Sequence, residues 1–149
     1  MSRRTSILQA LAEKFKDING TSPFNSNLNN NSYAKLKFWD EVQEFPAIYL
    51  SPGTETREYH PAQFAWGFLR VCVKIYCKSE DYAQEQLELL IRDVEICVER
   101  NRRLVYDQVT NEEVAEILID SITTDEGLLA PYAVGEVYLN VRYQIDLSI

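Results

Sequence analysis

The chain contains one histidine, the residue type on which most side-chain acid–base catalysis depends. His60 precedes Pro61, and no cysteine or second histidine stands near it at the spacing of metal ligands. No G-x-S-x-G elbow supplies a nucleophilic serine, and neither G-x-G-x-x-G nor a Walker loop is present to bind nucleotide phosphates. The sequence therefore predicts no nucleophilic catalysis, no metal site and no cofactor.

Paired carboxylates are the other groups that could act as a general acid and base. The acidic residues form adjacent pairs at the ends of expected helices and strands, where solvated charges usually lie: Asp40-Glu41, Glu80-Asp81, Glu112-Glu113 and Asp125-Glu126. We therefore expect that the chain is not an enzyme. A small cytoplasmic oligomeric α+β protein with an activity of its own remains an alternative.

The three cysteines, Cys72, Cys77 and Cys97, stand among apolar neighbours without a C-x-x-C spacing. An odd count with this surrounding is typical of reduced thiols that pack as small apolar side chains. A structural disulfide or a disulfide between subunits is the alternative.

The segment from Ala65 to Lys78 alternates between two kinds of side chain over about fourteen residues. Its odd positions are apolar or small, which predicts a long strand with one buried face. Its even positions combine aromatic residues with the cations Arg70, Lys74 and Lys78. The last segment, Ala133 to Leu147, alternates in the same way and places Glu136 and Asp146 at even positions.

Two helices and three further strand segments are expected around these strands. Apolar residues at three- and four-residue spacing predict helices over 5–17 and 80–103. Shorter strands are predicted at 45–50, 54–59 and 114–124, with Ser51-Pro52-Gly53 turning the first two into a hairpin. The asparagine-rich segment 19–32 is predicted to be a mobile surface loop, and 33–44 is ambiguous.

These elements predict a single α+β domain over 1–149, with a mixed or antiparallel sheet covered on one face by an N-terminal helix and a long central helix. A fifteen-residue strand spans about 50 Å, which is longer than the body of a domain of this size. We therefore expect the ends of the long strands to find cover on neighbouring subunits.

Composition limits the partners. The 149 residues carry 15 basic and 23 acidic side chains, so the net charge of −8 is opposite to that of a typical duplex DNA binder. No apolar run is long enough to span a bilayer, and the polar residues after Arg4 exclude a signal peptide there. We expect no membrane partner and assembly in the cytoplasm.

The order of elements resembles the tail terminator proteins of long-tailed bacteriophages. The resemblance covers nearly the whole chain and is carried by Thr5 to Leu11, Phe45-Pro46-Ala47-Ile48 with the following Ser51-Pro52-Gly53, the strand Leu69 to Tyr76, the helix Asp81 to Arg103 and the strand Val137 to Leu147. It implies a virion protein that forms a hexameric ring on the last ring of tail tube protein, ends tube polymerisation and joins the tail to a neck or head-completion protein. Contact with the tail sheath is also implied for contractile tails, and DNA would only pass through the channel.

The resemblance also implies which surfaces to assign. The hairpin expected over 51–59 and the even faces of the long strands would contact other subunits and the tube through Pro52, Gly53, Glu55, Arg57, Tyr59, Trp66, Phe68, Arg70, Lys74, Tyr138 and Arg142. An acidic channel would be lined by Glu116, Asp120, Glu136 and Asp146. A different neck, connector or tail-completion protein of the same virion is the alternative.

Overall fold

The computed structural model describes residues 2–148 and has the predicted α+β class. The elements follow the order α1 (Arg3–Phe15), β1 (Ser32–Tyr33), η1 (Trp39–Glu41), β2 (Ala47–His60), β3 (Phe64–Lys78), α2 (Ala83–Arg100), β4 (Val105–Asp107), β5 (Glu112–Glu113), β6 (Glu116–Thr124) and β7 (Tyr132–Asp146). No helix in the described part of the chain is long and apolar enough to cross a membrane.

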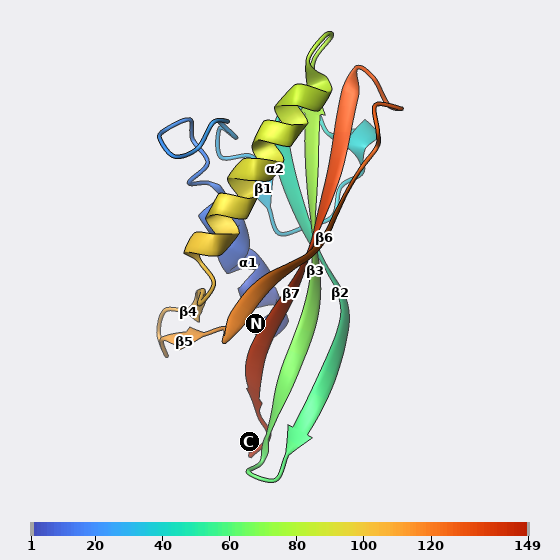
Figure 1. Cartoon of the computed structure of the whole chain (residues 1–149). Helices are drawn as coiled ribbons and strands as arrows, with labels where there is room; N and C mark the ends of the chain where they lie inside the picture. Colours follow the sequence, from blue (N-terminus) through green and yellow to red (C-terminus); the bar gives the residue numbers. More distant parts are fainter. Residues whose placement is uncertain (1, 149) are drawn as a thin grey trace.

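One mixed sheet dominates the structure, in the strand order β1-β2-β3-β7-β6. Only β1 runs parallel to its neighbour, and the other four strands are antiparallel. β4 and β5 form a separate two-stranded hairpin. As predicted, α1 and α2 lie on the same side of the sheet (Figure 1).

The alternating pattern correctly predicts which side chains face the helices. Leu69, Val71, Val73 and Ile75 of β3 are fully buried, and the odd residues of β7 join them in one core with both helices. Gly135 of β7 leaves room for α2, because a Cβ there would lie 3.0 Å from Leu87 Cδ1. Both helices are shorter than expected; α1 begins at Arg3 because Ser2 caps it, its Oγ accepting from Thr5 N at 3.1 Å.

The hairpin predicted over 45–59 is wrong. Residues 47–60 form one strand, β2, which pairs with β3 from Ala47↔Tyr76 to His60↔Phe64. The pairing shifts register between Pro52 and Glu55, so the Pro52-Gly53 pair marks a β-bulge in a continuous strand instead of a turn. The bulge also reverses which residues face the helices, from even positions before it to odd positions after it.

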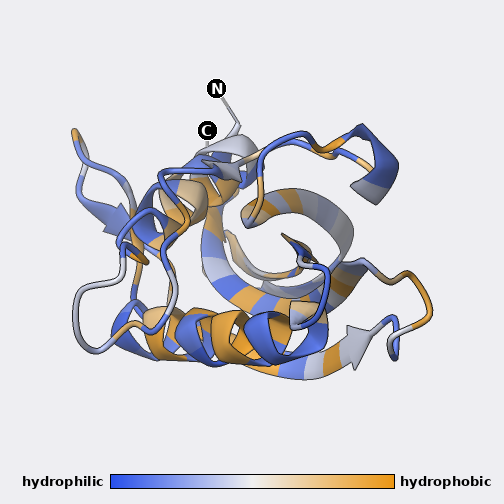
Figure 2. Ribbon diagram, turned by 90° about the horizontal axis from the view of Figure 1, so that it is seen from above, coloured by the Kyte–Doolittle hydropathy of each residue, from blue (hydrophilic) through white to orange (hydrophobic). Residues whose placement is uncertain are grey.

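The long strands do extend past the helices. β3 and β7 pair over fifteen residues each, and the ends of β2, β3 and β7 near the C-terminus reach beyond α1 and α2 (Figure 1). The sheet curls, with α2 on the outer side of the curl (Figure 2). Side chains of the strands cover one another there: Tyr143 is buried and donates to Glu55 Oε1 at 2.5 Å. Burial of this apolar face therefore needs no neighbouring chain, contrary to the expectation.

Candidate interaction surface

The face of the sheet opposite the helices, here called the open face, carries the even-numbered side chains of β3 and β7. The register places Trp66 beside Gln144, Phe68 beside Arg142, Arg70 beside Asn140, Cys72 beside Tyr138 and Lys74 beside Glu136. The sequence-predicted interface residues Trp66, Phe68, Arg70, Lys74, Tyr138 and Arg142 thus lie together on one surface. Most of them are half-buried, and Arg70 is exposed.

Two arginines of the open face lie flat against aromatic rings. The Arg70 guanidinium carbon is 4.4 Å from the ring centre of Tyr138, and that of Arg142 is 4.9 Å from Trp66. Stacking on a ring attracts a cation and holds it in one orientation. Among the described residues, the ion pairs include neither arginine. These side chains are therefore ordered but not neutralised.

Glu136 is the centre of a small polar network on the same face. Its carboxylate accepts from Lys74 Nζ at 2.9 Å and from the Tyr138 hydroxyl, and the Cys72 thiol lies at 3.8 Å. Burial opposes ionisation, but the hydrogen bonds from Tyr138 and Lys74 outweigh it and lower the pKa of Glu136. The same hydrogen bond raises the pKa of Tyr138 to about 12. Glu136 is therefore an ionised, paired carboxylate.

The four carboxylates expected to line a channel are not gathered in one place. Glu116 begins β6 beside Arg142 and binds Arg102 Nη2 at 2.9 Å. Asp120 lies in a β-bulge of β6, between Ile119 and Ser121. Asp146 pairs with Phe64 at the far end of β7, ten residues and about 33 Å of strand from Glu136. Glu116 and Glu136 belong to the open face with the arginines.

The residues predicted from the false hairpin lie apart from the open face. Because the bulge reverses the alternation, Glu55, Arg57 and Tyr59 share the side of Leu69 and Ala65. Glu55 pairs with Arg57 at 2.9 Å. Gly53 lies within the bulge, where its carbonyl accepts from Arg4 Nη2 of α1 at 3.0 Å.

The segment that was ambiguous in sequence, 33–46, covers one end of the open face. Trp39 and Phe45 pack on Tyr132 with ring centres 5.1 and 5.7 Å apart, and Tyr76 donates to Lys37 O at 2.6 Å. These contacts build a second, smaller core with Ala47 and Tyr49. Sequence reasoning missed it, because scattered aromatic residues without periodicity give no sign of the surface they will cover.

A buried carboxylate was also missed. Asp93 of α2 is 0% exposed and accepts from Asn25 N at 2.9 Å and Ser26 N at 2.7 Å, fastening the asparagine-rich segment to the helix. Leu28 of that segment is fully buried. Asp93 stands one position before Val94 on an apolar helix face, and an acidic residue at such a position is the signal that could have revealed it. Mobility of the segment stays a prediction.

The thiols are free, and two of the three are buried as predicted. Burial raises the pKa of Cys77 and of Cys97 to about 12, and it also raises the pKa of the half-buried Cys72. At pH 8 only about one Cys77 thiol in ten thousand is then a thiolate, the form that reacts. We expect Ellman's reagent to label the native chain slowly, Cys72 first, and to label three thiols at once in urea. Rapid native labelling of Cys77 would contradict this.

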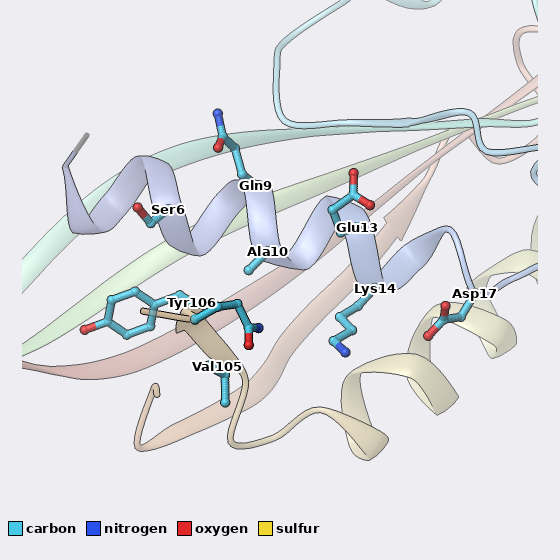
Figure 3. A pocket seen from close by; sticks show the side chains of 9 residues that line it. Ser6, Gln9, Ala10, Glu13, Lys14, Asp17, Val105 and Tyr106 are labelled. Carbon is cyan, nitrogen blue, oxygen red and sulfur yellow. The ribbon is translucent and has the colours of Figure 1, made fainter. Parts of the chain in front are cut away.

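The largest hollow lies elsewhere, between α1 and β4 (Figure 3). This open groove of about 450 Å³ is lined by Ser6, Gln9, Ala10, Glu13, Lys14, Asp17, Val105, Tyr106 and Gln108. Ser6 and Asp17 lie at opposite ends of it, and no histidine lines it (Figure 3). Within the described residues, no group of three His, Cys, Asp or Glu side chains could hold a metal ion.

The two long edges of the sheet are open to pairing. On one side, β1 pairs only with Ile48 and Tyr49 and leaves the remainder of β2 without a strand neighbour among the described residues. On the other side, β6 is the outermost strand, and its Leu118 and Ile122 are 47% and 40% exposed. Exposed apolar side chains on an edge strand are typical of strands that pair with another chain.

Comparisons with known proteins agree with this architecture. A solved chain in the virion of a native gene transfer agent particle has the same fold, with a TM-score of 0.60 at 10% identity over 93% of this chain and 95% of that chain. The tail tube terminator protein p142 of Escherichia phage T5 is 37% identical over 97% of this chain and 95% of its own. The model of the bacteriophage tail tube terminator protein family matches residues 1–148. The chain belongs to the bacteriophage tail tube terminator proteins, and it is a structural component of the virion tail.

Proposed function

We propose that the chain forms a closed ring, predicted to contain six subunits, that caps the last ring of tail tube protein and stops further tube growth. The observation that carries this proposal is the pair of free edges on one curled sheet. Three successive antiparallel pairings separate β2 from β6, so these two edge strands run in opposite directions. Subunits related by rotation about an axis along the strands can therefore continue the antiparallel sheet from β6 of one copy to β2 of the next.

The curl of the sheet supports a channel on its inner side. Because α2 lies on the outer side of the curl, the open face of each subunit would line the ring (Figure 2). DNA would pass this surface in transit. Glu116, Asp120, Glu136 and Asp146 remain our candidates for the acidic part of the channel.

The strand ends that reach beyond the helices are proposed to dock on the tube. Their rings are stacked in advance: His60 lies on Phe64 with centres 4.8 Å apart, and Phe64 meets Trp66 edge-on at 5.8 Å. Ordered aromatic side chains lose little conformational entropy on binding. The opposite end of the sheet carries the loops 79–82 and 125–131, and a ring face without such a hairpin would offer the next tube ring no equivalent seat. That face would meet a neck or head-completion protein, or the sheath in a contractile tail.

The solution mass of the chain tests this proposal when it is measured alone, with the tube protein of its virion and with the connector protein. We expect a closed ring that is present alone or forms on the tube, and a tube that no longer elongates once it is capped. Binding to the connector without binding to the tube would favour the other neck and tail-completion class.

A further inference from the structure

A small pocket opens on the open face where β3, β7 and β6 meet. It has a volume of about 120 Å³ and is lined by Phe68, Glu116, Leu118, Asn140 and Arg142. The floor is apolar, while Arg142 and Asn140 supply hydrogen-bond donors from β7. The volume suits one short side chain and excludes a larger ligand.

The pocket lacks an acceptor for a buried donor. Nε of Arg142 is buried and has no hydrogen-bond partner among the described residues. An unmatched buried donor on a cation costs more than a typical lost hydrogen bond. Glu116 is the only carboxylate lining the pocket, and Arg102 already holds it at 2.9 Å.

Arg70 adds a second cation beside the pocket. It lies opposite Asn140 in the β3–β7 register, diagonal to Arg142 and stacked on Tyr138. Two oriented guanidinium groups and a recessed donor are the arrangement that binds a carboxylate through charge-assisted hydrogen bonds. Duplex DNA fits less well, because its regularly spaced phosphates would also meet the acidic surface of a chain with a net charge of −8.

We propose that this pocket receives the carboxylate of an aspartate or glutamate side chain from the tail tube protein. The carboxylate accepts from Nε of Arg142, its stem lies on Phe68 and Leu118, and Arg70 neutralises its remaining charge. The proposal depends on the proposed function for the identity of the partner, whereas the pocket itself can be tested without the tube.

The first test titrates the ¹⁵N-labelled chain with N-acetyl-glutamate amide and follows the Nε–H signal of Arg142 and the side-chain amide signals of Asn140. We expect both signals to shift and saturate, and we expect N-acetyl-glutamine amide to shift neither. Signals that stay fixed with the carboxylate, or that respond only to a 12-base-pair DNA duplex, would overturn the carboxylate site.

The second test measures capping of purified tubes by R142Q and R70Q, with R92Q as the control because Arg92 is an exposed residue of α2 paired with Glu95. We expect capping affinity to fall about tenfold or more for R142Q, to fall less for R70Q and to stay unchanged for R92Q. If both open-face variants cap like the wild type, the tube does not use this pocket. If the wild type does not cap tubes at all, the proposed function fails, and the titration still decides whether the pocket binds a carboxylate.

Discussion

Asp93→Ala should lower the free energy of unfolding by about 3 kcal/mol, because it removes the acceptor of two backbone N–H groups in a site without water access. Asn25 N and Ser26 N both donate to this fully buried carboxylate, which joins residues 67 and 68 positions apart in the chain. Without it, the segment that buries Phe24 and Leu28 loses its attachment to α2. Urea unfolding followed by circular dichroism measures the change.

Two further variants separate the clamp from the mere loss of charge. Asp93→Asn keeps one acceptor oxygen and should lose about half as much stability, because its amide group faces a donor. Glu95→Gln removes a carboxylate two positions away that pairs only with the exposed Arg92, so the free energy of unfolding should change by less than about 0.5 kcal/mol. If Asp93→Ala unfolds at the urea concentration of the wild type, the clamp does not stabilise the fold.

Periodicity allowed most of the fold to be predicted. The alternation over 65–78 and 133–147 identified β3 and β7 and their buried faces, and the helical spacing identified α1 and α2, because core burial in these elements follows the backbone repeat. The proline-glycine pair at 52–53 misled the interpretation of β2. Turn and bulge use the same residue types, and only pairing with β3 decides between them.

The candidate site was predicted in part for the same reason. Even positions of β3 and β7 had to share a face, so the stacked arginines and the Lys74–Glu136 pair follow from alternation once the two strands are neighbours. The position of Asp120 in a bulge, the covering segment 33–46 and the unpartnered Nε of Arg142 depend on tertiary contacts. No local pattern in the sequence encodes them.

Ile122→Pro should abolish ring formation while leaving the subunit folded. Asp125 N donates to Val134 O, and the β6–β7 register continues through Thr123↔Glu136 and Ser121↔Tyr138, so the N–H groups of these alternate residues face β7. The N–H of Ile122 therefore points away from the sheet. Proline at this position removes only the outward donor, and edge positions tolerate it. Sedimentation or light scattering should then report the mass of single subunits.

A matched substitution and a mixing experiment identify the kind of joint. Ile122→Thr keeps the N–H group and the β-branched shape, so rings should persist. In a head-to-tail ring, the proline variant still offers an intact β2 edge and would join a growing arc and end it; with six subunits, an equal mixture with the wild type should leave only about 2% complete rings. If β6 paired with β6 instead, the variant would stay out and the wild-type half would assemble normally. Full assembly by the proline variant alone would show that β6 is not the joining edge.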